Sequence, residues 1–198
     1  PHSRGGLRPP ALSSPRRNSV HDDTVPHSEL ELMWPPMGTG SEKTVYQAFW
    51  RDGVVAAALL REGDGGTELR VLRALPQHPH LPTFFGVSRD QKGRTWLVTE
   101  FFPLGGLDTQ LEVWEGLLSS HVKFCIAQQI GEGVGKLNSL GVVHRDIASR
   151  NVLVHSLHAE NAADVWVKVT DFGSARIGQR GVGEAAGEDG LEGGPWRW

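Results

Sequence analysis

The sequence predicts an α+β fold, in which a small antiparallel sheet with one helix precedes a mainly helical part. Two runs of strand-forming residues, 44–50 and 54–60, flank a turn signal at 51–53 and predict a β-hairpin. A helix is indicated next by leucines that recur at three-residue spacing: Leu69, Leu72 and Leu75. A longer periodic pattern between Ser119 and Gly141 predicts a second helix.

The other predicted elements are shorter. Strands at 83–88 and 95–100 are joined by a polar turn and complete the sheet with the hairpin. In the long helix, Ser119 or Ser120 can act as the N-terminal cap, and Gly141 can end the helix. Its apolar positions have helical spacing: Val122, Cys125, Ile126, Ile130, Val134 and Leu137. Two short strands are expected after it, around 152–154 and 166–169.

Length and composition restrict the classes of protein. A chain of 198 residues can form one domain with a real core. Its net charge of -3 indicates neither nucleic-acid binding nor binding to an anionic membrane. Cys125 is the only cysteine, so no intrachain disulfide can form, and an intracellular, cytoplasmic setting fits. No apolar run reaches the roughly 20 residues that a membrane-spanning helix needs.

The most informative motifs are His144-Arg-Asp-Ile-Ala-Ser-Arg-Asn151 and Asp171-Phe-Gly173. This pair resembles the catalytic and metal-binding loops of eukaryotic protein kinases. The resemblance implies that Asp146 accepts the proton of the acceptor hydroxyl, and that Asn151 and Asp171 hold Mg²⁺ through oxygen ligands. Ala148 and Arg150 make the catalytic loop similar to that of tyrosine kinases, which places Arg150 among the catalytic residues.

The same resemblance implies a two-lobe protein-kinase fold that binds ATP and Mg²⁺ and acts on a protein substrate. The chain divides accordingly into a disordered leader at 1–29, an N-lobe at 30–103, the first part of a C-lobe at 104–176, and a disordered Gly- and Glu-rich tail at 177–198.

Two departures from the family pattern lie near the expected phosphate site. Gly38 and Gly40 fit the first two glycines of the phosphate-covering loop, but Lys43 replaces the third. The V-A-I-K motif corresponds to Val55-Ala-Ala-Ala58, so alanine stands where the family has its phosphate-binding lysine.

The two departures can be explained together. Side chains alternate along a strand, so Lys43 and Val45 should face one pocket, with Ala56 and Ala58 facing it from the neighbouring strand. Lys43 could then place its ammonium where the missing lysine would have put one. This arrangement resembles that of the with-no-lysine kinases, and we hypothesise that Lys43 is the catalytic lysine. The alternative is a solvated lysine on a surface loop.

The remaining site residues follow from the resemblance. Glu68 is expected to form the ion pair with the lysine, with an ordinary exposed helix acid as the alternative and Glu62 as a weaker rival. By the same resemblance Thr99 is at the gatekeeper position, and Glu100 and Phe102 belong to the hinge that offers backbone groups to adenine. The adenine ring is expected to lie between apolar walls formed by Val45, Ala56 and Leu153. A generic role in the core would predict the same burial for all of these residues.

The end of the chain lacks the activation segment and the further helices that the family has. We therefore expect a truncated C-lobe, and the start at Pro1 indicates a fragment. If the apolar surface of the long helix is left uncovered, it would favour aggregation or the binding of a partner. The predicted function is a protein kinase whose 198-residue chain alone phosphorylates proteins poorly. The alternatives are a non-catalytic pseudokinase or scaffold, and a product that does not fold stably.

Overall fold

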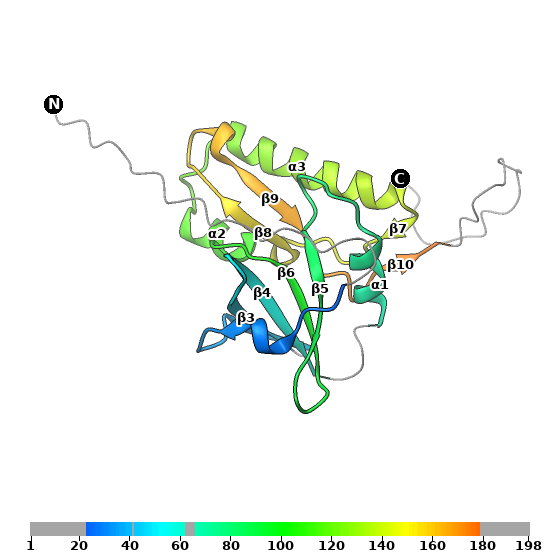
Figure 1. The fold of residues 1–198 in the computed structure, drawn as a ribbon. Helices are drawn as coiled ribbons and strands as arrows, with labels where there is room; N and C mark the ends of the chain where they lie inside the picture. Colours follow the sequence, from blue (N-terminus) through cyan, green and yellow to red (C-terminus); the bar gives the residue numbers. More distant parts are fainter. Residues whose placement is uncertain (1–22, 41, 62–65, 179–198) are drawn as a thin grey trace, which may run out of the picture.

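The computed structural model describes residues 23–40, 42–61 and 66–178, which form two parts (Figure 1). The first part is an antiparallel sheet with helix α1 (Gly66–Ala74) beside it. In the second part, helix α3 (Ser120–Ser139) runs along a hairpin of β8 (Val152–Ser156) and β9 (Trp166–Val169). The predicted α+β architecture is confirmed, with the sheet and one helix preceding the helical part.

The sheet has the strand order β1-β3-β4-β6-β5, and β2 also pairs with β3. The strands are β1 (Glu31–Leu32), β2 (Gly38–Thr39), β3 (Lys43–Trp50), β4 (Gly53–Leu60), β5 (Phe84–Arg89) and β6 (Thr95–Glu100). The predicted hairpin is confirmed as β3 and β4. Its register places Val45 opposite Ala58, and the next pair of strands places Ala56 opposite Thr99. These small and apolar residues therefore lie side by side across three strands.

Helix α1 packs on the sheet through its apolar face. Leu69, Val71 and Leu72 are buried in one core cluster that also contains Leu97 of β6 and Phe172. Because residues on one face of a helix recur every three or four positions, burial of this face determines which side of α1 meets the sheet. Glu68 precedes the first of these buried residues and is carried by the same helix.

The second part begins with α2 (Leu107–Val113) and continues into α3. The Ser119 hydroxyl accepts a hydrogen bond from the Val122 amide at 3.2 Å, which identifies Ser119 as the N-terminal cap. Gly141 has a φ of 73°, the left-handed conformation that favours glycine after a helix. The short strands β7 (Val142–Val143) and β10 (Arg176–Ile177) pair beyond this point. Three-residue 3-10 helices lie at His27–Glu29, Ser149–Asn151 and Ala162–Asp164.

The apolar face of α3 is largely covered, contrary to the expectation of an uncovered helix. Val122 and Ile126 are buried against strands β8 and β9, and Leu137 is buried in the cluster that contains α1. Phe124 is the large apolar side chain of α3 that remains exposed to solvent, with 67% of its surface accessible. The two-stranded hairpin provides this cover, because its own inward side chains need an apolar partner.

The predicted disorder of residues 1–29 is wrong for the part that the structure describes. Residues 27–29 form a 3-10 helix, and Val25 is only 1% exposed, packed in the core cluster on the far side of the sheet. At the other end, Ile177 belongs to β10 and the Gly178 amide donates to the Gly141 carbonyl. The rest of the predicted leader and tail, 1–22 and 179–198, lies outside the described residues.

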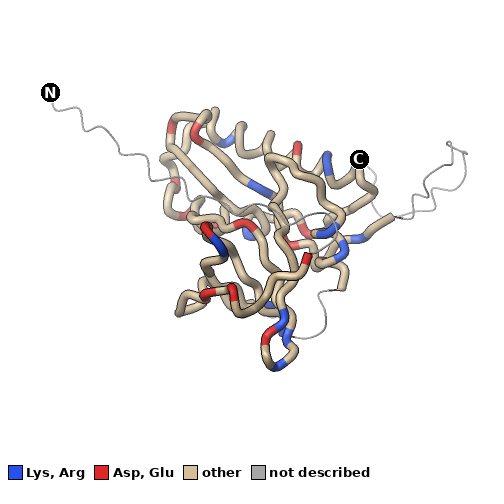
Figure 2. The backbone as a smooth tube through the Cα atoms, in the orientation of Figure 1, with Lys and Arg blue, Asp and Glu red and all other residues tan. Residues whose placement is uncertain are grey.

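Charged residues of both signs are spread over both parts of the molecule (Figure 2). Within the described ranges, no helix combines the length and the apolar character that crossing a membrane requires.

Candidate active site

A cavity of about 530 Å³ lies where the sheet meets the second part. Its size is within the range of pockets that hold small molecules. Its walls come from β2, β3, β4, β6 and α1, from the connection at 102–106, and from the two motif loops. Most of the predicted site residues line it: Gly38, Lys43, Val45, Ala56, Glu68, Thr99, Phe102, Arg150, Asn151, Leu153 and Asp171.

Two residues predicted to bind nucleotide do not line this cavity, namely Gly40 and Glu100. The Glu100 carboxylate is turned into the core, where it accepts hydrogen bonds from Lys168 Nζ at 2.7 Å and from the Thr83 amide at 3.1 Å. Gly40 lies in the loop between β2 and β3, where its amide donates to the Lys43 carbonyl at 2.9 Å. This ion pair, between residues 68 positions apart in the sequence, could not be predicted from local patterns, and the expectation that the Glu100 backbone faces adenine stays a prediction.

Sequence reasoning missed several residues of the cavity wall. Leu72 and Leu97 contribute apolar surface, and residues 103–106 form part of the opposite side. Leu97 could have been found from the strand pairing, because it lies directly opposite Ala58 in the register. Met37 and Thr170 also line the cavity, and no pattern in the sequence indicated either of them.

Lys43 points into this cavity from the start of β3. Its ammonium lies 2.6 Å from Glu68 Oε1 and 3.0 Å from Asp171 Oδ1. Burial by itself lowers the pKa of Lys43, but the Glu68 and Asp171 carboxylates outweigh it, so the pKa is raised. Lys43 is therefore protonated at neutral pH. The small side chain of Ala58, which also lines the cavity, leaves room for it.

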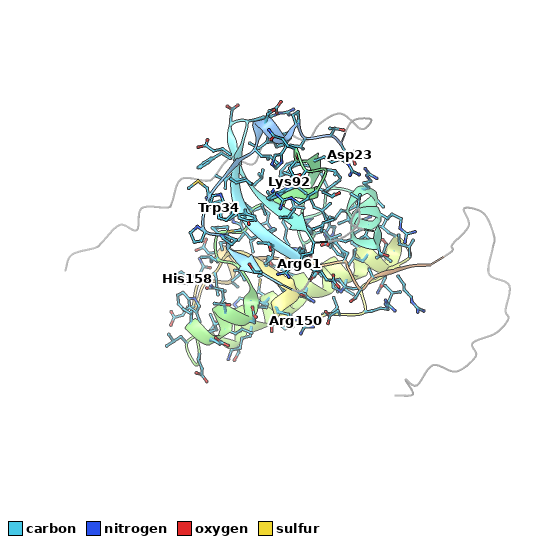
Figure 3. The ribbon with its side chains drawn as sticks, turned by 90° about the horizontal axis from the view of Figure 1, so that it is seen from below. Asp23, Trp34, Arg61, Lys92, Arg150 and His158 are labelled. Carbon is cyan, nitrogen blue, oxygen red and sulfur yellow. The ribbon has the colours of Figure 1, made fainter. Side chains whose placement is uncertain are left out.

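The catalytic-loop motif places three polar side chains in contact. The Arg150 guanidinium donates to Asp146 Oδ1 at 2.6 Å, and the Asn151 amide nitrogen donates to Asp146 Oδ2 at 2.9 Å. The hydrogen bond from Arg150, together with that from Asn151, lowers the pKa of Asp146 despite an opposing effect of desolvation. Asp146 is therefore ionised at neutral pH and able to accept a proton. Arg150 is labelled in Figure 3.

Replacing Arg150 with glutamine should move the pKa of Asp146 back up toward its ordinary value. The reason is that the change removes a charged donor while Asn151 stays in place. A carbon-detected NMR titration of the Asp146 carboxyl in both proteins measures this directly and does not depend on activity. Arg145→Gln is the matched control, because Arg145 donates to the Ser174 carbonyl at 2.6 Å instead. An unchanged titration in Arg150→Gln would contradict the role given to this contact.

His144 and Phe172 join the two motif loops. The His144 and Phe172 rings meet edge to face with centroids 5.5 Å apart, and His144 Nε2 lies 2.9 Å from the Thr170 carbonyl. Because the Asp146 amide donates to His144 Nδ1 at 3.3 Å, the ring proton belongs on Nε2. Arg145 and Asp171 have φ values of 67° and 64°, which are uncommon for residues other than glycine. Both loops thus hold backbone conformations of the kind that cluster at functional sites.

The side chains at the cavity fit a magnesium–nucleotide complex. Asp171 and the amide oxygen of Asn151 are hard oxygen ligands, and both residues line the cavity. Within the described ranges, no three His, Cys, Asp or Glu side chains gather into a metal-binding group. Two protein ligands match Mg²⁺, which usually keeps water and substrate phosphates as its other ligands.

Comparison with known proteins agrees with this geometry. The family model described as protein tyrosine and serine/threonine kinase matches residues 37–198. A probable serine/threonine-protein kinase of Dictyostelium discoideum is 29% identical over 83% of this chain and 28% of its own length. The tyrosine-protein kinase Btk of Drosophila melanogaster is 32% identical over 88% of this chain and 23% of its own. The human tyrosine-protein kinase TXK is 33% identical over 75% of this chain and 28% of its own.

The chain thus spans about a quarter of the length of these curated relatives, with 28%, 23% and 28% covered. The family match nevertheless includes the cavity, the Lys43 contacts and both motif loops. On these grounds the chain belongs to the protein tyrosine and serine/threonine kinase family.

Proposed function

We propose that the 530 Å³ cavity binds Mg·ATP for transfer of the γ-phosphoryl group to a protein hydroxyl, with Lys43 as the phosphate-binding lysine, and that the 198-residue chain alone performs this transfer poorly. The observation that carries the proposal is the contact of Lys43 with both Glu68 and Asp171, at 2.6 and 3.0 Å. Kinases need a lysine paired with a helix glutamate and an aspartate that holds the metal. Here the Lys43 ammonium contacts both the Glu68 and the Asp171 carboxylate.

Each polar residue then has a part in positioning and charge balance. Lys43 donates to phosphate oxygens, and Glu68 holds the Lys43 ammonium in place. Asp171 and Asn151 hold the Mg²⁺ ion, which neutralises charge on the phosphates when it is bound. Asp146 accepts the proton of the acceptor hydroxyl, and Arg150 and Asn151 keep its carboxylate oriented. Residues 102–106 line the cavity, and we expect adenine to bind beside them.

The class of acceptor hydroxyl follows from the catalytic loop. We infer tyrosine, because Ala148 and Arg150 make this loop similar to that of tyrosine kinases, and both Btk and TXK carry tyrosine-protein kinase in their names. A second candidate function is nucleotide binding without phosphoryl transfer. Ala58 favours it, because this alanine lies in the cavity wall where the family has its lysine.

Millimolar Mg·ATP should raise the melting temperature of the chain. A ligand that binds only the folded state adds about 2.7 kcal/mol at 100 times its dissociation constant. For a chain of this size we expect a shift of roughly 5–10 °C. Calorimetry or dye-based melting with ATP, with Mg·ATP, and with ATP plus a chelator separates metal-dependent binding from a general anion effect.

Asp171→Asn is the matched control for this measurement, because it retains the side-chain shape but removes the charge that holds the metal. It should lose most of the magnesium-dependent shift. If the chain melts cooperatively but Mg·ATP leaves its melting temperature unchanged, both candidate functions are excluded. A shift without transfer to a tyrosine-containing peptide, measured on a form of the protein with a complete C-lobe, would favour the second candidate function.

A further inference from the structure

The segment at 23–30 is anchored alongside β5, the last strand in the order of the sheet. The Val25 amide donates to the Val87 carbonyl at 2.8 Å, and the Val87 amide donates to the Asp23 carbonyl at 2.7 Å. Gly86 permits this close approach, because a Cβ atom there would overlap the Asp23 carbonyl oxygen. With Val25 buried as well, the backbone of Asp23 is fixed relative to β5.

The side chain of Asp23 reaches from this segment to α1. Arg73, in the last turn of the helix, places Nε 2.5 Å from Asp23 Oδ2 and Nη2 3.4 Å from Oδ1. Figure 3 shows Asp23 beside α1. A cavity of about 360 Å³ separates the segment from the helix and is lined by Asp23, Leu69, Arg73 and seven other residues. The ion pair therefore bridges a region that side chains do not fill.

Helix α1 is thus held by ion pairs near both of its ends. Glu68 in the first turn contacts Lys43, and Arg73 contacts Asp23. These two helix residues lie five positions apart, or about 7.5 Å along the axis. The buried leucines set how deep the helix sits, but a helix on an apolar surface can still shift along it. The Asp23–Arg73 pair opposes such a shift, because the Asp23 backbone is anchored to β5.

We propose that Asp23 is a positioning residue for the active site, acting through Arg73 on α1 and hence on the placement of Glu68 against Lys43. The part that concerns nucleotide binding rests on the proposed function, whereas the restraint on α1 does not. The segment ahead of the sheet thereby acquires a role in arranging the phosphate-binding lysine.

Asp23→Asn tests this proposal through two measurements. Hydrogen exchange of the α1 amides, followed without nucleotide, should become faster by about two- to fivefold, the range that the loss of an exposed ion pair allows. The dissociation constant for Mg·ATP should rise by a similar factor of about two to five, because Glu68 then holds Lys43 less firmly. Asp23→Glu and the exchanged pair Asp23→Arg with Arg73→Asp should both bring α1 exchange back toward the wild-type rate.

Arg94→Gln is the matched control, because it removes an arginine that pairs with Asp90 in the β5–β6 turn, away from α1. It should leave α1 exchange unchanged. Unchanged α1 exchange in Asp23→Asn would overturn the proposal, as would an exchanged pair that stays as fast as the single variant. If the wild-type chain fails to bind Mg·ATP while Asp23→Asn still speeds α1 exchange, the proposed function falls and the positioning role stands.

Discussion

Replacing Lys43 with alanine should weaken Mg·ATP binding roughly 10- to 100-fold, the range expected for the loss of a charged hydrogen-bond donor. Two effects act in the same direction. The phosphates lose their cationic partner, and the Glu68 and Asp171 carboxylates lose the ammonium that lies between them. Those uncompensated carboxylates would repel the anionic phosphates. Isothermal titration of both proteins with Mg·ATP measures the change.

Lys92→Ala is the matched control, because Lys92 lies in the exposed turn between β5 and β6 (Figure 3). It should bind as the wild type does. Equal affinity in the Lys43 and Lys92 variants would contradict the role given to Lys43.

Moving the lysine to the neighbouring strand is a stricter test. The double variant Lys43→Gly with Ala58→Lys restores the family's usual pattern, and the added side chain enters the same cavity because Ala58 lines it. It should recover a large part of the lost affinity. Ala58→Lys alone should bind worse than the double variant, because two ammonium groups would then compete for Glu68 and Asp171. A double variant no better than Lys43→Ala would show that the position of the lysine matters beyond its charge.

Replacing Lys168 with methionine should destabilise the fold by about 3–5 kcal/mol, the usual cost of leaving one member of a buried ion pair alone. Lys168 and Glu100 are only 5% and 7% exposed, and their charged atoms lie 2.7 Å apart. Methionine retains most of the side-chain length, so the main effect is the loss of the charge. Glu100 would keep only the Thr83 amide as a donor in the structure described here. Urea denaturation measures the free energy of unfolding.

The double variant Lys168→Met with Glu100→Leu separates burial of charge from packing. It should be more stable than Lys168→Met alone, because it leaves no unpaired carboxylate in the core. Lys92→Met is the control at an exposed position and should change stability by less than about 0.5 kcal/mol. A double variant that is less stable than the single one would mean that packing around Glu100, and not its charge, determines the cost.

The order of the strands and helices was readable from local patterns. The hairpin of β3 and β4 followed from strand-forming runs around a turn, and the cap of α3 followed from a serine ahead of a periodic run. The hypothesis about Lys43 came from the resemblance to the with-no-lysine kinases, together with the alternation along β3 that places its side chain with that of Val45. In the structure both residues line the cavity.

Local patterns did not indicate the contacts between residues far apart in the chain. The Glu100 carboxylate pairs in the core with Lys168, which lies 68 positions further along the sequence. Residues 23–29 were expected to be disordered because the stretch is polar. One buried valine and a glycine on the facing strand allow them to pack on the sheet instead. No periodic pattern in a short polar segment indicates such a contact.

By itself the sequence determined the family, the two motif loops and the identity of the side chains that carry charge into the site. It could do so because Asp146, Arg150 and Asn151 lie within one short loop, where spacing alone decides which groups can meet. Only the tertiary structure decided that Lys43 meets Glu68 and Asp171, that the Glu100 carboxylate meets Lys168, and that Asp23 reaches α1. These pairs are brought together by the packing of the sheet against α1 and the second part, which depends on the folded chain as a whole.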